Sequence, residues 1–288
     1  MLERDFNTIS PSAKVLLMMK ARTDIPFAKE AAALLKENHI TEETPGIASR
    51  QKAFGYLVHF ENRYRTIDDL LYSVHPNNIL ELSSGFSFRG LQLCTERSDV
   101  FYIDTDLPAF IELKKDLVDQ LTAAYTISVK GNLLLQPLNA MNEEQFFSVV
   151  GKFPPGPVTI VNEGLLMYLD EEEKRLLCGT IHRVLKERGG CWITGDIYIK
   201  KEKTPADEKD NLYLTEFLEE HRVEDKKFEN FEAAGAFFHS CGFSIKAKRQ
   251  EVVEKLSALK LLKNIPFDPA LLVPAFSHRQ TWMLEVGE

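Results

Sequence analysis

The segment that decides the fold is Ile79-Leu80-Glu81-Leu82-Ser83-Ser84-Gly85-Phe86-Ser87-Phe88-Arg89. Its apolar start is typical of a buried strand, and the small residues that follow predict a tight turn into a helix. At such a turn, Glu81, Ser83 and Gly85 lie where backbone amides and the positive end of a helix approach a ligand. A plain strand–helix turn explains Gly85 alone equally well. The segments that follow in the sequence must therefore distinguish a ligand-binding turn from a plain strand–helix turn.

Short apolar runs alternate with longer periodic segments from this point to the end of the chain. The runs are Ile79–Leu82, Val100–Ile103, Tyr125–Val129, Val158–Val161, Cys191–Thr194, Phe243–Lys246 and Thr281–Val286. The periodic segments are Phe88–Glu96, Pro108–Leu121, Glu143–Val150, Glu171–Glu187 and Phe231–Ser240. This alternation predicts an α/β fold with a doubly wound, seven-stranded and mostly parallel sheet.

Helical periodicity dominates the first quarter of the chain. Ala13–Met19, Ala28–Leu35 and Ala53–Leu71 predict helices. We therefore expect an N-terminal helical cap over residues 1–75 and a core over residues 76–288. The charge-rich segment Ile199–Phe228 interrupts the later alternation, so we expect either a helical lid or a disordered insertion there.

Composition narrows the class of protein. The 288 residues carry 35 basic and 43 acidic side chains, a net charge of −8, which disfavours a nucleic-acid partner. The four cysteines have no metal-ligand spacing, so we expect reduced core thiols and no metal site. The acidic N-terminus and the lack of a long apolar run predict a cytoplasmic protein with no membrane contact. The oligomeric state stays open.

Two acids follow the second predicted strand. Asp104 and Asp106 stand about 20 residues after the turn, where a doubly wound nucleoside-binding fold places the carboxylate that accepts ribose hydroxyls. Either acid alone would more often be a loop charge or a helix cap. Together with the small-residue turn, the spacing favours nucleoside binding.

Several further motifs resemble the leucine carboxyl methyltransferase family, whose members are class I S-adenosylmethionine-dependent methyltransferases. Asn162-Glu163-Gly164-Leu165-Leu166-Met167-Tyr168-Leu169 is similar to the EGLLMYL signature of the family, and Asp106-Leu107-Pro108 matches its D-L-P. Arg63 and Arg65 before Ile67-Asp68-Asp69 resemble its entry segment, while Leu16–Pro26 is similar to the bacterial branch associated with polyketide O-methylation. The resemblance extends from about Leu16 to Asp196.

The chain departs from the family pattern at the first turn. Leu82-Ser83-Ser84-Gly85 stands where the family usually has L-G-x-G, and Ser87-Phe88-Arg89 keeps only the arginine of its D-T-R. Serine adopts positive φ with difficulty, so we expect either a negative φ at Ser83 or a rearranged turn.

The resemblance implies S-adenosylmethionine as the cofactor and assigns a role to each matching residue. Asp106 would hold the ribose, Asn132 and Leu133 would flank the adenine, Arg63 would meet the methionyl carboxylate, and Glu163 would face the amino group. These pairings agree with the chemistry, since an arginine fork suits a carboxylate and an acid suits an ammonium. For Arg63 the alternative is a surface charge.

The methyl acceptor can be a carboxylate or an acidic hydroxyl of a small, polyketide-like molecule. A carboxylate needs only donors to orient it, for which Arg22, Arg89 and Tyr168 are candidates. A hydroxyl would benefit from a base such as His59 or Asp196. The alternatives are a structural His59, an Asp196 that caps the next turn, and an Arg22 that pairs with Glu30.

Two other classes of function remain open. A dinucleotide-dependent oxidoreductase fits the βα pattern and the acid after the second strand, although no G-x-G-x-x-G follows the first strand. A catalytically idle protein that binds S-adenosylmethionine fits the serine at position 83.

Overall fold

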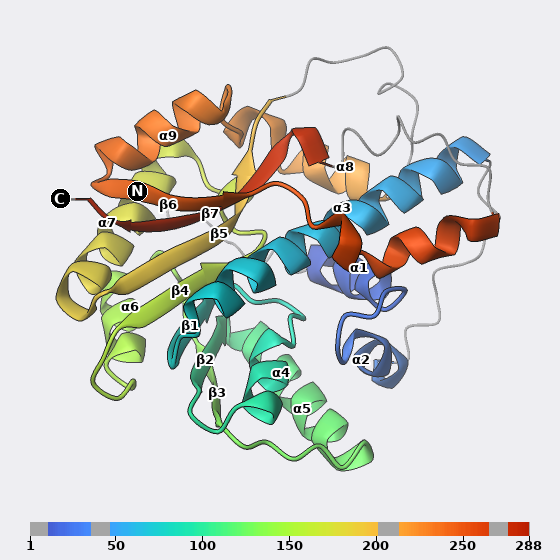
Figure 1. Ribbon diagram of the computed structural model, residues 1–288, viewed down its shortest axis with the longest axis horizontal. Helices are drawn as coiled ribbons and strands as arrows, with labels where there is room; N and C mark the ends of the chain where they lie inside the picture. Colours follow the sequence, from blue (N-terminus) through green and yellow to red (C-terminus); the bar gives the residue numbers. More distant parts are fainter. Residues whose placement is uncertain (1–10, 36–46, 201–212, 265–275, 288) are drawn as a thin grey trace.

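One mixed sheet of seven strands organises the molecule (Figure 1). The computed structural model describes residues 11–35, 47–200, 213–264 and 276–287. The strand order is β3-β2-β1-β4-β5-β7-β6, and β7 runs antiparallel to both of its neighbours. The strands are β1 Asn78–Leu82, β2 Phe101–Asp106, β3 Asn132–Pro137, β4 Val158–Asn162, β5 Gly190–Tyr198, β6 Phe243–Arg249 and β7 Arg279–Val286. The predicted fold class is confirmed.

The third strand is not where the sequence predicts it. Residues 125–131 contain no strand: Tyr125 ends a helix, and Thr126 has a φ of 53°. The strand is formed instead by the run that contains Leu133, Leu134 and Leu135. β-branched residues gave residues 125–129 a high strand propensity, but pairing with β2 decides which segment enters the sheet.

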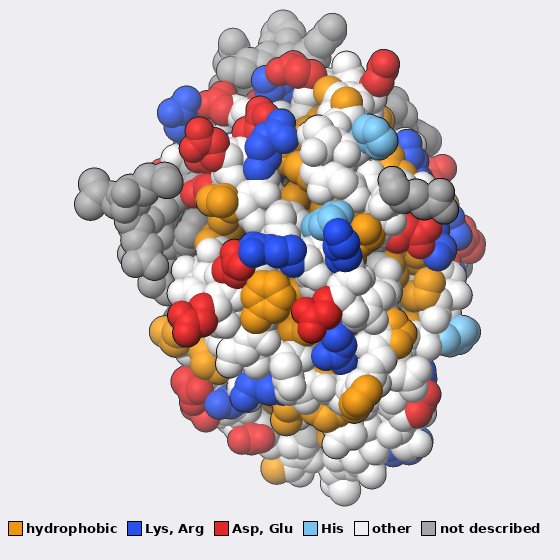
Figure 2. Space-filling view, turned by 90° about the vertical axis from the view of Figure 1, so that its left-hand side faces the viewer, with side chains coloured by type: hydrophobic (Ala, Val, Ile, Leu, Met, Phe, Trp, Pro, Cys, Tyr) orange, Lys and Arg blue, Asp and Glu red, His pale blue; other side chains and the backbone are white. Residues whose placement is uncertain are grey.

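Helices cover both faces of the sheet. They are α1 Pro11–Lys20, α2 Ala28–Leu34, α3 Ile47–Val74, α4 Arg89–Glu96, α5 Pro108–Ala124, α6 Glu143–Val150, α7 Glu171–Arg188, α8 Tyr213–Glu220 and α9 Phe231–Ser240, together with short 3₁₀ turns such as η2 Leu166–Tyr168. Alternation along β1 shows the two layers. Leu80 joins the cluster beneath α6, α7 and α9, whereas Ile79 faces α3 and α4. Figure 2 shows the side on which α6, α7 and α9 lie, with positive and negative side chains interspersed.

The N-terminal helices pack beside the sheet near the carboxyl ends of its central strands. Leu17 of α1 and Ala28 of α2 share a buried cluster with Phe86 and with Phe110 of α5. This packing places α1 against the turn that follows β1.

The inserted segment contains one α-helix, α8, and a 3₁₀ turn at Glu224–Lys226 within its described residues. α8 lies within the predicted lid, while residues 201–212 of that lid lie outside the described residues. The ring of Phe217 packs on Tyr168 with 6.3 Å between the ring centroids, so α8 covers the turn after β4. Within the described parts of the chain, no helix is long and apolar enough to cross a bilayer.

Candidate cofactor-binding site

Two residues of the turn after β1 have a left-handed backbone conformation. Ser83 has a φ of 47° and Gly85 a φ of 50°, both in the left-handed region. The expectation that Ser83 has a negative φ is therefore wrong. The serine adopts the conformation that glycine adopts freely, at a cost of about 1 kcal/mol or more. A Cβ on Gly85 would lie 3.4 Å from the Cβ of Ala13, so α1 covers the turn closely.

The two acids of β2 have different environments. Asp104 is buried, pairs with Lys114 Nζ at 2.6 Å and accepts a hydrogen bond from the Ser84 hydroxyl. Asp106 ends the strand and is partly exposed, and its carboxylate accepts the backbone N–H groups of Gly85 at 2.8 Å and Leu107 at 2.7 Å. Burial raises the pKa of both carboxyls. Of the two, Asp106 is the less buried acid.

Three cations surround the carboxylate of Glu163. Lys20 Nζ lies 2.7 Å and Arg63 Nε 3.3 Å from its Oε1, and Arg89 lies 3.2 Å from its Oε2. Burial alone would raise the pKa of Glu163, but the cations together hold it well below its ordinary value. Burial lowers the pKa of Lys20. These contacts bring α1, α3 and α4 together on the residue that follows β4.

Arg89 continues this ion cluster towards β1. Its guanidinium pairs with Glu81 and lies 2.7 Å from Asp68 Oδ1. Glu81 also accepts a hydrogen bond from Tyr102 at 2.6 Å. All these side chains are buried, so Arg89 and Glu81 are placed to hold α3, α4 and β1 in position. We use the term Glu163 cluster for Lys20, Arg63, Asp68, Glu81, Arg89 and Glu163.

Asp196 organises the loop that presents Glu163. Its Oδ1 accepts the Gly164 N–H at 2.7 Å, and its Oδ2 accepts the N–H groups of Leu165 at 2.7 Å and Leu166 at 3.0 Å and the Asn162 amide at 2.7 Å. A carboxylate with both oxygens engaged in this way fixes a backbone. Asp196 thus has a structural function, although the segment that it binds is the loop after β4 and not the next turn that the sequence suggested.

Gly164 lets the cluster close on this loop. It has a φ of 80°, and a Cβ there would lie 3.4 Å from Arg63 Nη2. A side chain at this position would be strained and would crowd the guanidinium. The close approach of the Arg63 guanidinium thus explains why a glycine follows Glu163.

A second group of polar residues lies beside Arg63. The Tyr198 hydroxyl accepts a hydrogen bond from Arg63 Nη1 at 3.0 Å and lies 2.9 Å from His59 Nε2. Burial raises the pKa of Tyr198. Tyr168, Tyr198, Met167 and Phe217 form one apolar cluster beneath α8. The structure therefore gives His59 a polar partner, the Tyr198 hydroxyl, that the sequence did not indicate.

Other predicted site residues lie apart from these groups. Asn132 pairs with Phe101 and Pro137 with Asp106, so Asn132 and Leu133 start β3 at the amino edge of the sheet. This position contradicts the assignment of Asn132 and Leu133 as neighbours of the adenine. Leu138, which donates its N–H to Asp106 O at 2.8 Å, occupies the carboxyl edge instead.

The structure buries Lys20 of α1, whereas the sequence favoured Arg22 as the functional cation of this region. Arg22 is exposed and forms no ion pair with Glu30 within the described residues, whereas Lys20 belongs to the Glu163 cluster. Tyr64 of α3 is also buried there, and its hydroxyl lacks a hydrogen-bond partner among the described residues. The spacing of Leu17 and Lys20 on one helical face is the signal that could have found Lys20.

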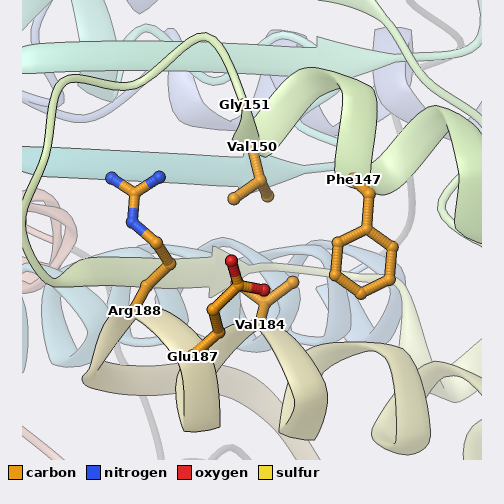
Figure 3. Close-up of a pocket in the computed structure, with 6 residues that line it drawn as sticks. All are labelled: Phe147, Val150, Gly151, Val184, Glu187 and Arg188. Carbon is orange, nitrogen blue, oxygen red and sulfur yellow. The ribbon is translucent and has the colours of Figure 1, made fainter.

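Figure 3 shows a pocket near the amino ends of β4 and β5, at the opposite ends of the strands from the candidate site. Its volume is about 90 Å³, and it lies between α6 and α7 with Glu187 and Arg188 at its rim. Sites for small ligands usually enclose about 300–1,000 Å³. This pocket is too small for a nucleoside cofactor and takes no part in the candidate site.

Solved structures support the fold. A DUF574 family protein from Streptomyces avermitilis has a TM-score of 0.54 and 12% identity, with 96% of this chain and 97% of that chain covered. At this identity the likeness shows the fold alone. No protein-family model and no curated protein sequence matches the chain.

Two methyltransferases show a weaker likeness. An O-methyltransferase family protein from Burkholderia thailandensis has a TM-score of 0.47 and 11% identity, and the match covers 82% of this chain but only 60% of that chain. Magnesium protoporphyrin IX methyltransferase from Synechocystis, solved with bound SAH, has a TM-score of 0.46, 9% identity and coverage of 92% and 96%. At TM-scores below 0.5 these likenesses carry no further conclusion.

Proposed function

We propose that the protein is an S-adenosylmethionine-dependent O-methyltransferase related to the leucine carboxyl methyltransferase family. The observation that carries the proposal is the Glu163 cluster, which lies after β4 while the left-handed turn and Asp106 lie at the ends of β1 and β2. In open α/β sheets, ligands bind at the carboxyl ends of the strands where the strand order reverses.

The charges of the cluster suit a zwitterion. Lys20, Arg63 and Arg89 balance Glu163, Glu81 and Asp68, so the ammonium and the carboxylate of a methionyl group would leave this balance unchanged, while its sulfonium would add one positive charge. Glu163 would accept the ammonium in place of Lys20, and Lys20 and Arg63 would then hold the carboxylate. Asp106 would accept the ribose hydroxyls, and the Tyr64 hydroxyl supplies a further buried polar group.

The residues of the chain would contribute positioning and exclusion of water. S-adenosylmethionine supplies, when bound, a methyl group that is already activated for transfer. Arg63 would fix one end of the cofactor and Asp106 the other, while α1 and α8 would keep water from the reacting atoms.

We propose that the methyl acceptor is a small, polyketide-like molecule with a carboxylate or an acidic hydroxyl. The N-terminal cap supports this, because it resembles the bacterial branch associated with polyketide O-methylation. The apolar cluster of Met167, Tyr168, Tyr198 and Phe217 offers aromatic surface close to Arg63. A carboxylate acceptor needs no base, and a hydroxyl acceptor could pass its proton to the His59–Tyr198 pair.

Calorimetric titration with S-adenosylmethionine and with NAD⁺ tests the proposal. We expect binding of the former, no binding of the latter, and a loss of about 10-fold or more in Arg63→Gln because an ionic hydrogen bond is removed. The matched control is Arg97→Gln, which removes a partly exposed arginine paired with Asp99, remote from the Glu163 cluster, and should leave the affinity unchanged. Binding of NAD⁺ alone, or equal losses in the two variants, would contradict the proposal.

A further inference from the structure

Two thiols meet on the side of the sheet that carries α7 and α9. Cys178 lies on α7 and is fully buried, while Cys241 follows the last residue of α9 and is half-buried. Cys241 packs against the buried apolar cluster that contains Cys178. Both helices lie on the left of Figure 1, away from α1 and α2 at the candidate cofactor site.

Contacts on either side of Cys178 fix this arrangement. Arg175, Cys178 and His182 share one face of α7 through their i, i+3 and i+4 spacing. Arg175 Nη1 lies 3.1 Å from Ser240 Oγ and 3.9 Å from Cys241 Sγ. A Cβ on Gly242 would lie 2.8 Å from His182 Nε2, so the chain passes close to α7 there. Cys178 is thereby held opposite Cys241.

The two thiols differ in acidity. The neighbouring Cys178 thiol, together with Ser240 and Arg175, lowers the pKa of Cys241. The neighbouring Cys241 and burial raise the pKa of Cys178. A thiolate is the reactive form of cysteine, and a nearby cation and partial exposure favour it. Cys241 is thus suited to react first and Cys178 to react second.

We propose that Cys178 and Cys241 form a peroxide-responsive pair that closes to a disulfide between α7 and the end of α9. The Cys241 thiolate attacks one oxygen of hydrogen peroxide, so an S–O bond forms, the O–O bond breaks, and the departing hydroxide takes up a proton as water. Cys178 then attacks the sulfenic sulfur. The S–S bond forms, the S–O bond breaks, and the released hydroxide takes the Cys178 proton as a second water. A dithiol reductant would restore both thiols.

Mass spectrometry of the full chain after treatment with hydrogen peroxide tests this proposal independently of any methyl transfer. We expect a loss of about 2 Da and one linked peptide that contains Cys178 and Cys241. Cys94 and Cys191 are buried, and burial raises the pKa of Cys94 to about 12, so both serve as internal controls that stay reduced. Oxidation of Cys94 or Cys191 before the pair, or no linked peptide, would overturn the proposal.

Variants separate the two thiols. In Cys178→Ala, and in Cys178→Ser should the first variant unfold, Cys241 should stop at a sulfenic acid that dimedone traps. In Cys241→Ser, Cys178 should stay reduced. Arg175→Gln should slow alkylation of Cys241 by about 3- to 10-fold near neutral pH because it removes the cation beside the thiolate. Arg183→Gln, on the same helix and paired with Glu143, should leave that rate unchanged. Equal rates in both arginine variants would contradict the assigned order of reaction.

Discussion

The amino ends and the carboxyl ends of the parallel strands differ in the polar contacts that form there. At the amino ends of the strands, the Arg188 guanidinium donates to the backbone oxygens of Gly156 at 3.1 Å and Pro154 at 2.5 Å. The Asn78 amide donates to the backbone oxygens of Pro154 and Pro157, both at 3.3 Å. These contacts close loops. At the carboxyl edge, six charged side chains form the buried Glu163 cluster, next to two residues with positive φ.

This difference indicates where the ligand site lies. Burying paired charges costs desolvation, and apolar side chains of similar volume would often stabilise a protein as well. Groups of perturbed ionisable residues therefore occur preferentially where a protein binds or reacts. The carboxyl ends of the strands have this property.

The largest effect is expected at Glu163. Glu163→Gln leaves Lys20, Arg63 and Arg89 with too little negative charge in a buried place, so the free energy of unfolding should fall by about 3–5 kcal/mol. Glu143→Gln breaks an exposed pair with Arg183 and should change it by less than about 1 kcal/mol. Urea denaturation measures both. Similar losses in the two variants would remove the distinction between buried and exposed charges.

The same residue should give stability a pH dependence. The pKa of Glu163 is lowered in the folded protein, so its contribution is present above the ordinary glutamate pKa of about 4.3 and is lost as the pH falls below it. The difference in unfolding free energy between the natural chain and Glu163→Gln should therefore shrink from pH 6 towards pH 3. A difference that stays constant over this range would mean that Glu163 is not held ionised by its partners.

The two acids of β2 should separate binding from stability. Asp106→Ala should weaken S-adenosylmethionine binding by about 10- to 150-fold, equivalent to roughly 1.5–3 kcal/mol, because it removes the charged acceptor for the ribose. Asp104→Ala should chiefly lower the melting temperature, because it leaves Lys114 buried without its carboxylate. Calorimetry and thermal unfolding of both variants check this division. Equal losses of affinity would mean that the ribose does not select Asp106.

A small effect is expected at the turn after β1. Ser83→Gly relieves a left-handed serine and should raise the free energy of unfolding by up to about 1 kcal/mol. Gly85→Ala, the matched change two residues later, should lower it because it introduces a side chain at a positive φ. Chemical denaturation compares them, and a loss of stability in Ser83→Gly would refute strain at this serine.

Local pattern was sufficient to predict most of the fold. The α6 segment Glu143–Val150 and the α9 segment Phe231–Ser240 agree with the structure to the residue, since clear periodicity and caps such as Asn142 mark their ends. β3 could not be placed in this way. Two adjacent apolar runs competed for one position, and the pairing with β2 that chose between them is a long-range contact.

The candidate site was predictable where a residue belongs to a motif. Asp106, Arg63 and Glu163 stand in motifs, and the structure brings Arg63 and Glu163 into direct contact. Tyr64 carries no local mark, and only its spacing from Leu17 marks Lys20, because the burial of both residues depends on how α1 packs against α3. Asp196 was ambiguous for the same reason, since the four donors that occupy it become visible only when the loop after β4 folds over it.

A crystal structure of the protein with S-adenosylhomocysteine tests the central claim most directly. We predict the ribose hydroxyls on Asp106, the amino group on Glu163 and the carboxylate on Arg63 and Lys20, with Ser83 still at a positive φ. A nucleoside bound elsewhere, such as between α6 and α7, or a complex in which Lys20 and Arg63 stay paired with Glu163 and touch no ligand, would contradict the account.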